Sequence, residues 1–392
     1  MTAHDAKPNA DLYPLPPPEQ TRGKAGWQFV YWVLGGALVG FLLAHFDMTL
    51  SLPFDRDHVS LPTILVSILL ALWLQVLIHE AGHVVAGRLG GKRLLVAGFG
   101  PWRLLRQDGR WHIQWVGQIQ GISGFAAMYT PHGHTERKSQ AALFMLGGPL
   151  GNLVGAGLAV ILAPMLPDGA SWLRELAFWL FVMGLVTAAL NLLPLNVGGW
   201  RSDGHQLLAL LRNDPSVTAE MQRGQLLALT MAGIRPREWP QELVPAAPGE
   251  TDSPAARFGS QFFRMELALD TGDTKLAGEC AAALAGDFWH MPDGQRQGAA
   301  VLLALHAAWF LEDRDLLEAW LEHVCGGLVR QDCAKALLEA EAARLSRQPE
   351  VMQEALERAE ATLSGVIDEV SRTQFRERIN ELAGRADKIT RA

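Results

Sequence analysis

Two histidines and a glutamate stand close together near the end of a long apolar stretch: His79, Glu80 and His83. Residues four apart on a helix lie on the same face, so both imidazoles can bind one metal ion. The intervening glutamate projects near that face and can accept a proton from a metal-activated water molecule. The sequence therefore predicts His79 and His83 as metal ligands and Glu80 as a general base.

The environment of this motif favours a functional interpretation. The run 58–79 contains no Asp, Glu, Lys or Arg, and the motif stands at its end. Ionisable groups at membrane depth are costly and mark functional sites. A helix that begins near Leu61 carries His79 about 27 Å along its axis, which is close to one membrane surface.

Four stretches without charged side chains are long enough to cross a membrane, because about 20 apolar residues span a hydrocarbon core of roughly 30 Å. After residue 205 the longest charge-free run is 297–311, which suits a buried core helix better than a membrane span. The expected fold is a polytopic α-helical membrane protein with four transmembrane helices and a soluble C-terminal half. The helices are expected at about 25–46, 58–89, 139–167 and 174–200.

Basic residues orient these helices. The connection after the second span carries seven Lys and Arg residues against two acidic ones, whereas the connection before it carries a single Arg. The positive-inside rule then puts both termini in the cytoplasm of a multi-pass cell-membrane protein, with a bacterial cytoplasmic membrane expected. The net charge of −7 gives no basic footprint for nucleic acid, and the three cysteines form no Cys-x-x-Cys pair of the kind that binds zinc.

The connection 91–130 has the pattern of a small cytoplasmic β-hairpin sheet. Short apolar runs alternate there with turn residues, and Asp108-Gly109 between two of these runs is a strong hairpin signal. A further strand is expected from Gly124 to Tyr129. This sheet would lie between two membrane helices, on the side of the membrane where His79 ends its span.

Two later polar residues are candidates for the same site. Pro194 breaks the last span, and Asp203 follows on the same side of the membrane as His79, so Asp203 is the candidate third metal ligand. The alternative is that Asp203 caps the helix after it. In the third span Asn152 is a polar group at membrane depth, which either hydrogen-bonds a ligand or holds neighbouring helices together.

Together these residues resemble the site-2 protease family of intramembrane zinc metalloproteases. His79-Glu80-Ala81-Gly82-His83 is similar to the family's zinc helix, and Gly148-Pro149-Leu150-Gly151-Asn152 is similar to its Gly-Pro-x-x-Asn segment. Asn191-Leu192-Leu193-Pro194 with Asp203-Gly204 resembles its Asn-x-x-Pro … Asp-Gly element, whose Asp is the third zinc ligand. The connection after the second span is too short for the PDZ domain that many members insert there, so the resemblance is to the subgroup without that domain.

The resemblance implies one zinc ion as cofactor and a transmembrane protein as substrate, cleaved in the lipid bilayer within or near its membrane segment. It also implies that Asn152 or Asn191 steadies the oxyanion. Two segments of 91–130 are similar to the family's substrate-side β-hairpins, and they give the candidate substrate-binding residues Gly98, Phe99, Gly100, Gly124 and Phe125.

The chain is expected to divide into four parts. Residues 1–24 are proline-rich without apolar periodicity and are expected to be a disordered cytoplasmic arm, while 25–212 form the membrane core. Residues 213–255 are expected to be a helical segment and linker. Residues 256–392 have the cadence of helix–turn–helix repeats, which favours an all-α, tetratricopeptide-like domain that binds a protein partner, with a plain helical bundle as the alternative.

Three functions fit the sequence to different degrees. The first is an intramembrane zinc endopeptidase. The second is a non-enzymatic membrane scaffold that recruits partners through its C-terminal domain; the intact Glu80 argues against it, because a structural zinc site needs no base. The third, a prenyl-protein-type membrane metalloprotease, requires a glutamate ligand in a late helix, and Glu175 is expected on the far side of the membrane.

Overall fold

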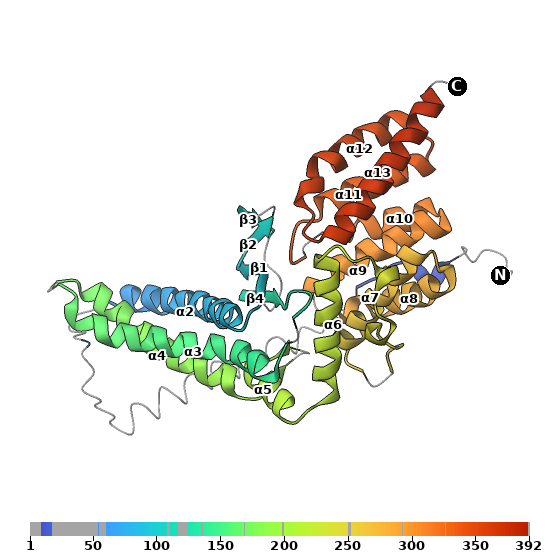
Figure 1. The fold of residues 1–392 in the computed structure, drawn as a ribbon. Coiled ribbons are helices and arrows are strands. Elements are labelled where there is room, and N and C mark those ends of the chain that lie inside the picture. Colours follow the sequence, from blue (N-terminus) through green and yellow to red (C-terminus); the bar gives the residue numbers. More distant parts are fainter. Residues whose placement is uncertain are drawn as a thin grey trace, which may run out of the picture. The chain divides into compact units, whose positions relative to one another are not determined.

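The computed structural model describes most of the chain as helices, with one small antiparallel sheet (Figure 1). The chain forms two compact units. One comprises Met1–Leu15, Gln75–Leu153 and Val186–Ala392, and the other comprises Pro16–Leu74 and Val154–Leu185. The described residues are 9–17, 54, 60–107, 110–116, 124–134, 136–167, 169–197, 200–249, 252–291, 293–325 and 327–390.

Within these residues, three helices are long and apolar enough to cross a membrane. They are α2 (Leu61–Leu89), α3 (Lys138–Leu162, continued by the 3-10 turn η2, Ala163–Met165) and α4 (Ser171–Leu192). The expected span 25–46 lies outside the described residues. Helix α4 ends at Leu192 rather than near residue 200, because Pro194 cannot donate to the helix and disfavours helical backbone before it.

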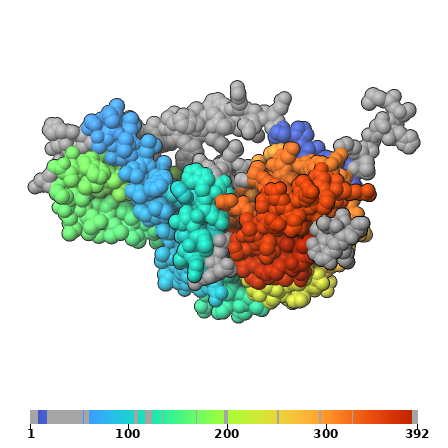
Figure 2. All heavy atoms as spheres, turned by 90° about the horizontal axis from the view of Figure 1, so that it is seen from above, coloured from blue at the N-terminus to red at the C-terminus, as the bar shows by residue number. Residues whose placement is uncertain are grey.

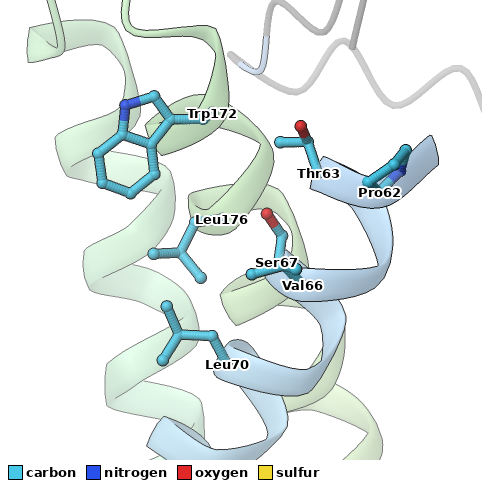
Figure 3. A pocket seen from close by; sticks show the side chains of 7 residues that line it. All are labelled: Pro62, Thr63, Val66, Ser67, Leu70, Trp172 and Leu176. Atoms are coloured by element: carbon cyan, nitrogen blue, oxygen red, sulfur yellow. The ribbon is translucent and has the colours of Figure 1, made fainter. Parts of the chain in front are cut away.

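The described helices of the second unit have apolar surfaces, and their residues hold no candidate chemistry. Leu65, Leu69 and Val154 are more than half exposed, as expected of side chains that face lipid. The first turns of α2 and α4 border a cavity of about 270 Å³, lined by apolar side chains and two hydroxyls (Figure 3). No titratable side chain lines this cavity, so it offers no candidate metal ligand.

The sheet expected within 91–130 is present. Its strands are β1 (Arg93–Phe99), β2 (Trp102–Gln107), β3 (Arg110–Trp115) and β4 (Gly124–Tyr129), in the antiparallel order β3-β2-β1-β4. Gln107 pairs with Arg110, which leaves the two-residue Asp108-Gly109 connection that the sequence predicted. Strand β4 is therefore one edge of the sheet, and its first residue pairs with the last residue of β1.

The chain beyond α4 is helical apart from a short hairpin of β5 (Asn196–Val197) and β6 (Trp200–Arg201). Helices that follow one another pack as pairs, most extensively α7 with α8 and α11 with α12. This pairing fits the predicted helix–turn–helix cadence, while the tetratricopeptide-like assignment stays a prediction. The helices are α5 (Asp203–Leu211), α6 (Pro215–Met231), α7 (Pro254–Thr271), α8 (Thr274–Asp287), α9 (Asp293–His306), α10 (Arg314–Leu321), α11 (Asp332–Leu345), α12 (Pro349–Thr362) and α13 (Glu369–Thr390), with short turns η3 (Pro236–Glu238), η4 (Gln241–Leu243), η5 (Phe288–His290), η6 (Ala307–Leu311) and η7 (Leu363–Gly365).

Segment 213–255 packs on the C-terminal helices rather than standing apart as a linker. Leu226 of α6 and Trp239 share a buried cluster with Phe263 of α7. Arg235 and Arg237 both donate hydrogen bonds to the fully buried carboxylate of Asp270 in α7. Burial alone would raise the pKa of Asp270, but these hydrogen bonds outweigh it and hold the pKa well below its usual range.

Residues 9–17 also differ from the disordered arm that we predicted for 1–24. They include a 3-10 turn, η1 (Ala10–Leu12), and Leu12 is buried in the main core of the C-terminal helices. The prolines of this segment prevent regular structure, but its leucine and tyrosine pack against apolar side chains far away in the sequence. Sequence periodicity cannot reveal such a contact, because it reports only local structure.

Candidate metal centre

Glycines let α2 and α3 approach until their backbones touch. A Cβ atom on Gly82 would collide with the carbonyl oxygen of Gly147, and one on Gly151 would lie 2.9 Å from the carbonyl oxygen of Ile78. Such close helix contacts need small residues. The contact brings the Gly-Pro-x-x-Asn segment of α3 against the histidine motif of α2.

The two histidines point their Nε2 atoms at one another, 3.1 Å apart. Behind them, Nδ1 of His79 lies 2.8 Å from Oδ1 of Asn152, and Nδ1 of His83 lies 2.7 Å from the backbone oxygen of Phe144. Both partners are oxygen acceptors, so each Nδ1 carries the proton in the neutral ring. Each Nε2 therefore presents a lone pair to the space between the two rings.

Asp203 brings a third acceptor to the same space. Its Oδ2 lies 3.2 Å from Nε2 of His79 and 3.4 Å from Nε2 of His83. This oxygen is buried, and none of the described groups donates a hydrogen bond to it. The alternative role of Asp203 as a helix cap is wrong, because Ser202 is the N-cap of α5 and accepts from the backbone of His205.

These three atoms fit a bound zinc ion. Bonds of about 2.0–2.1 Å in a tetrahedral site separate neighbouring ligand atoms by about 3.3–3.4 Å, close to the three distances described above. Three acceptors with no proton between them repel one another unless a cation lies among them. The three residues form the group of potential metal ligands found among the described residues.

Gly148 lets α3 lie directly against the two histidines. A Cβ atom on this residue would lie 2.5 Å from Nε2 of His83 and 2.6 Å from Nε2 of His79. Any larger residue at this position would therefore displace the two candidate ligand atoms from Asp203.

The end of α4 positions Asp203. Ser202 Oγ donates to the backbone oxygen of Leu193 and accepts from the backbone nitrogen of Leu195, so the start of α5 is tied to the break at the end of α4. A Cβ atom on Gly204 would collide with the backbone of Leu192, which explains why glycine follows the aspartate. The β5–β6 hairpin takes up the intervening residues, so the long interval after Pro194 still returns Asp203 to the histidines.

Glu80 lies between the metal group and the sheet. A Cβ atom on Gly124 would lie 2.8 Å from Cγ and 3.0 Å from Oε1 of Glu80. The first residue of β4 therefore borders the candidate base. The residue of β4 that lies beside Glu80 is therefore a glycine, at the first position of the strand.

The two asparagines make hydrogen bonds within the protein, and the oxyanion role implied by the resemblance stays a prediction. Asn152 is fully buried, and its Nδ2 donates to the backbone oxygen and to Oε1 of Gln75, at 2.7 and 2.8 Å. Its Oδ1 faces His79, so Asn152 is a positioning residue behind a metal ligand. Asn191 donates its Nδ2 to the backbone oxygen of Thr187 in its own helix, at 2.9 Å.

Gln75 is the residue whose role the sequence did not predict. It is fully buried and completes the chain of hydrogen bonds from its own amide through Asn152 to His79. A signal was available, because it stands four residues before His79 and so lies on the same helix face. A buried amide on the metal face of a helix is typical of a group that orients a ligand.

The other candidate substrate-binding residues shape the end of the sheet. Gly98 makes room for the ring of Phe125 across the strand pair, and that ring lies 5.1 Å from the guanidinium of Arg103. Gly100 has a φ of 53° in the turn after β1, and Phe99 pairs with Gly124. Of the five residues, Gly124 is the one that the described structure brings against Glu80.

Comparison with known proteins agrees with this geometry. Residues 67–168 match the model of peptidase family M50, and no curated protein or solved structure matches the chain. The matched segment includes the histidine motif, the sheet and the Gly-Pro-x-x-Asn segment, while Asp203 lies beyond it. This segment of the chain is therefore similar to peptidase family M50, the site-2 protease family, as the sequence motifs predicted.

Proposed function

We propose that this protein is an intramembrane zinc endopeptidase that cleaves a transmembrane protein within or near its membrane segment. The observation that carries the proposal is the convergence of three candidate ligand atoms, from His79, His83 and Asp203, with Gly148 packed against the two imidazoles. The family supports a protease of this type. Lipid-facing helices support action inside a membrane.

Each residue of the site then has a stated task. His79, His83 and Asp203 would hold the ion, and Asn152 and Phe144 fix the two rings. A zinc ion held there would supply the Lewis acidity that activates water and polarises the scissile carbonyl. The carboxylate of Glu80 would accept the proton of the attacking water and pass it to the leaving amine.

We propose the predicted four-span topology with both termini in the cytoplasm, and the N-terminal contact supports it. Leu12 and Leu15 accept hydrogen bonds from Trp320 and Trp289 of the C-terminal domain. A contact between the two ends of the chain favours an even number of crossings, and the apolar run 25–46 is the proposed fourth crossing.

Capture of the substrate is proposed to occur by strand addition. A transmembrane helix hides its peptide bonds, so the substrate must unwind before cleavage. An extended segment that pairs with the edge strand β4 gains main-chain hydrogen bonds. Because β4 begins against Glu80, the paired segment would bring its backbone to the base.

Proline in β4 tests this capture. Successive backbone N–H groups of a strand point alternately to its partner and to its open edge, so one of Ala126 and Ala127 donates outward. We expect Ala126→Pro or Ala127→Pro to abolish cleavage while the zinc content stays that of wild type. The matched control is Ile113→Pro in β3, the opposite edge strand. Cleavage that survives in both β4 variants contradicts strand addition at this edge.

The proposed activity is tested with purified protein in detergent and a panel of single-span membrane proteins. We expect cleavage within or near the span, loss of cleavage after metal is removed by a chelator, and recovery with stoichiometric Zn²⁺. The scaffold function predicts zinc binding without cleavage of any member of the panel, and that result would overturn the protease proposal.

A further inference from the structure

Residues 9–15 lie against the C-terminal helical domain although they are remote from it in the sequence. The two hydrogen bonds that join them link residues 308 and 274 positions apart. Turn η1 contacts α8, and in Figure 2 the blue atoms of the segment lie at the surface beside the orange helices. The membrane core and α5–α7 lie between the segment and this surface in the sequence. The contact is therefore a long-range one.

Two tryptophans recognise the backbone of the segment. Trp320 is fully buried, and its Nε1 donates to the carbonyl oxygen of Leu12 at 2.9 Å. Trp289 donates to the carbonyl oxygen of Leu15 at 2.6 Å. An indole can only donate, so the acceptor for the buried Trp320 comes from the N-terminal segment. Both contacts are made to the backbone of the segment, one at the end of turn η1 and the other three residues later.

The tryptophans belong to an aromatic cluster that gives the site its shape. Ring centroids of Phe288 and Trp320 lie 5.0 Å apart, and those of Trp289 and His323 lie 5.6 Å apart. The cluster comes from η5, α10 and the turn after α10. Such a cluster is a rigid surface that loses little conformational freedom when it binds a ligand.

One side chain of the segment anchors it. Leu12 is 7% exposed and belongs to the main core of the domain, and Tyr13 packs beside it. Leu15 is 57% exposed although its carbonyl is bound. A single buried anchor with flanking backbone hydrogen bonds is the arrangement by which domains bind short peptides.

The conformation of the segment is also that of a peptide ligand. Tyr13 is extended, with φ −72° and ψ 147°, and prolines follow at 14, 16, 17 and 18. Proline favours this extended form before binding, so little conformational entropy is lost on docking. The segment adds no helix to the helix pairs of the domain.

We propose that α8, η5 and α10 form a peptide-binding site, and that the chain's own segment around Asp11-Leu12-Tyr13-Pro14-Leu15 is its intramolecular ligand. The site takes peptides with a leucine anchor at the end of a short 3-10 turn, followed by an extended, proline-containing stretch. The tethered segment competes at high local concentration with any free peptide of this pattern. Its release would free the site, and this binding activity is independent of the proposed protease activity.

The test separates a docked ligand from an integral part of the fold. A recognition sequence for a site-specific protease is inserted after Pro17 in the full chain, which is purified in detergent, cut and freed of the released fragment. A fluorescent peptide of residues 9–17 is then titrated, with anisotropy as the readout. We expect at least tenfold tighter binding to the cut chain than to the uncut chain, and no binding of a peptide in which Leu12 is replaced by Asp.

Two tryptophan variants localise the binding. Trp320→Phe keeps the ring but removes the donor, and we expect it to weaken peptide binding to the cut chain about tenfold. The matched control is Trp309→Phe, because Trp309 donates to Glu341 elsewhere in the domain. Equal binding to cut and uncut chains, no binding to the cut chain, or loss of its cooperative thermal unfolding would each overturn the proposal.

Discussion

Replacing Glu80 with glutamine is expected to lower the rate of peptide-bond cleavage by about a hundred- to ten-thousandfold, the usual contribution of a general base, while the zinc content stays unchanged. Glutamine has nearly the same shape as glutamate but cannot accept a proton at neutral pH. Glu80 stands outside the three-residue ligand group, so the ligand atoms of His79, His83 and Asp203 remain in place. Cleavage and zinc content are measured on the same preparation.

The matched control is Glu175→Gln, at the other glutamate of the three described membrane helices. Its carboxylate accepts a hydrogen bond from Nε1 of Trp179, and a glutamine oxygen can accept the same bond. We expect wild-type cleavage in this variant. A Glu80→Gln variant that still cleaves, or that loses its zinc, would contradict the assignment of Glu80 as the base.

The second large effect is expected from one methyl group in α3. Gly148→Ala places a Cβ atom 2.5 Å from Nε2 of His83 and 2.6 Å from Nε2 of His79, closer than such atoms can approach. The methyl group collides with both imidazoles and displaces their Nε2 atoms. We expect zinc binding to weaken and cleavage to fall by at least about a hundredfold, because the ligands must hold their geometry closely.

Gly157→Ala is the control for Gly148→Ala. Gly157 lies in the same helix, and a Cβ atom there meets nothing within 4 Å. Alanine favours helix over glycine by about 1 kcal/mol, so this variant is expected to fold and cleave like wild type. If both variants behave alike, the close packing of Gly148 against the imidazoles has no role in metal binding.

The sequence predicts that His79 and His83 lie together because helix geometry alone decides it, while their metal binding stays a prediction. The spacing of His79 and His83 fixes their common face wherever the helix lies. Asp203 is harder, since its return to the histidines depends on the break at Pro194 and on the β5–β6 hairpin. That prediction rested on topology, and the structure does bring the three residues together.

The partners of Asn152 could not be predicted in the same way. Its amide donates to Gln75 and faces His79 because glycines let α2 and α3 approach closely, and the rotation of one helix against the other is a tertiary property. The same holds for residues 9–17, which have no periodic pattern of their own. Trp289 and Trp320 donate hydrogen bonds to the backbone of this segment, and no local sequence pattern reports such long-range contacts.

The zinc content of purified wild type and Asp203→Ala, measured together after dialysis against a weak chelator, tests the central claim most directly. Asp214→Ala serves as control, because Asp214 is the exposed N-cap of α6. The metal site predicts about one zinc ion per wild-type chain, the same in the control, and at least tenfold less in Asp203→Ala. Equal zinc in wild type and Asp203→Ala, or no zinc in wild type, would contradict the metal centre of His79, His83 and Asp203.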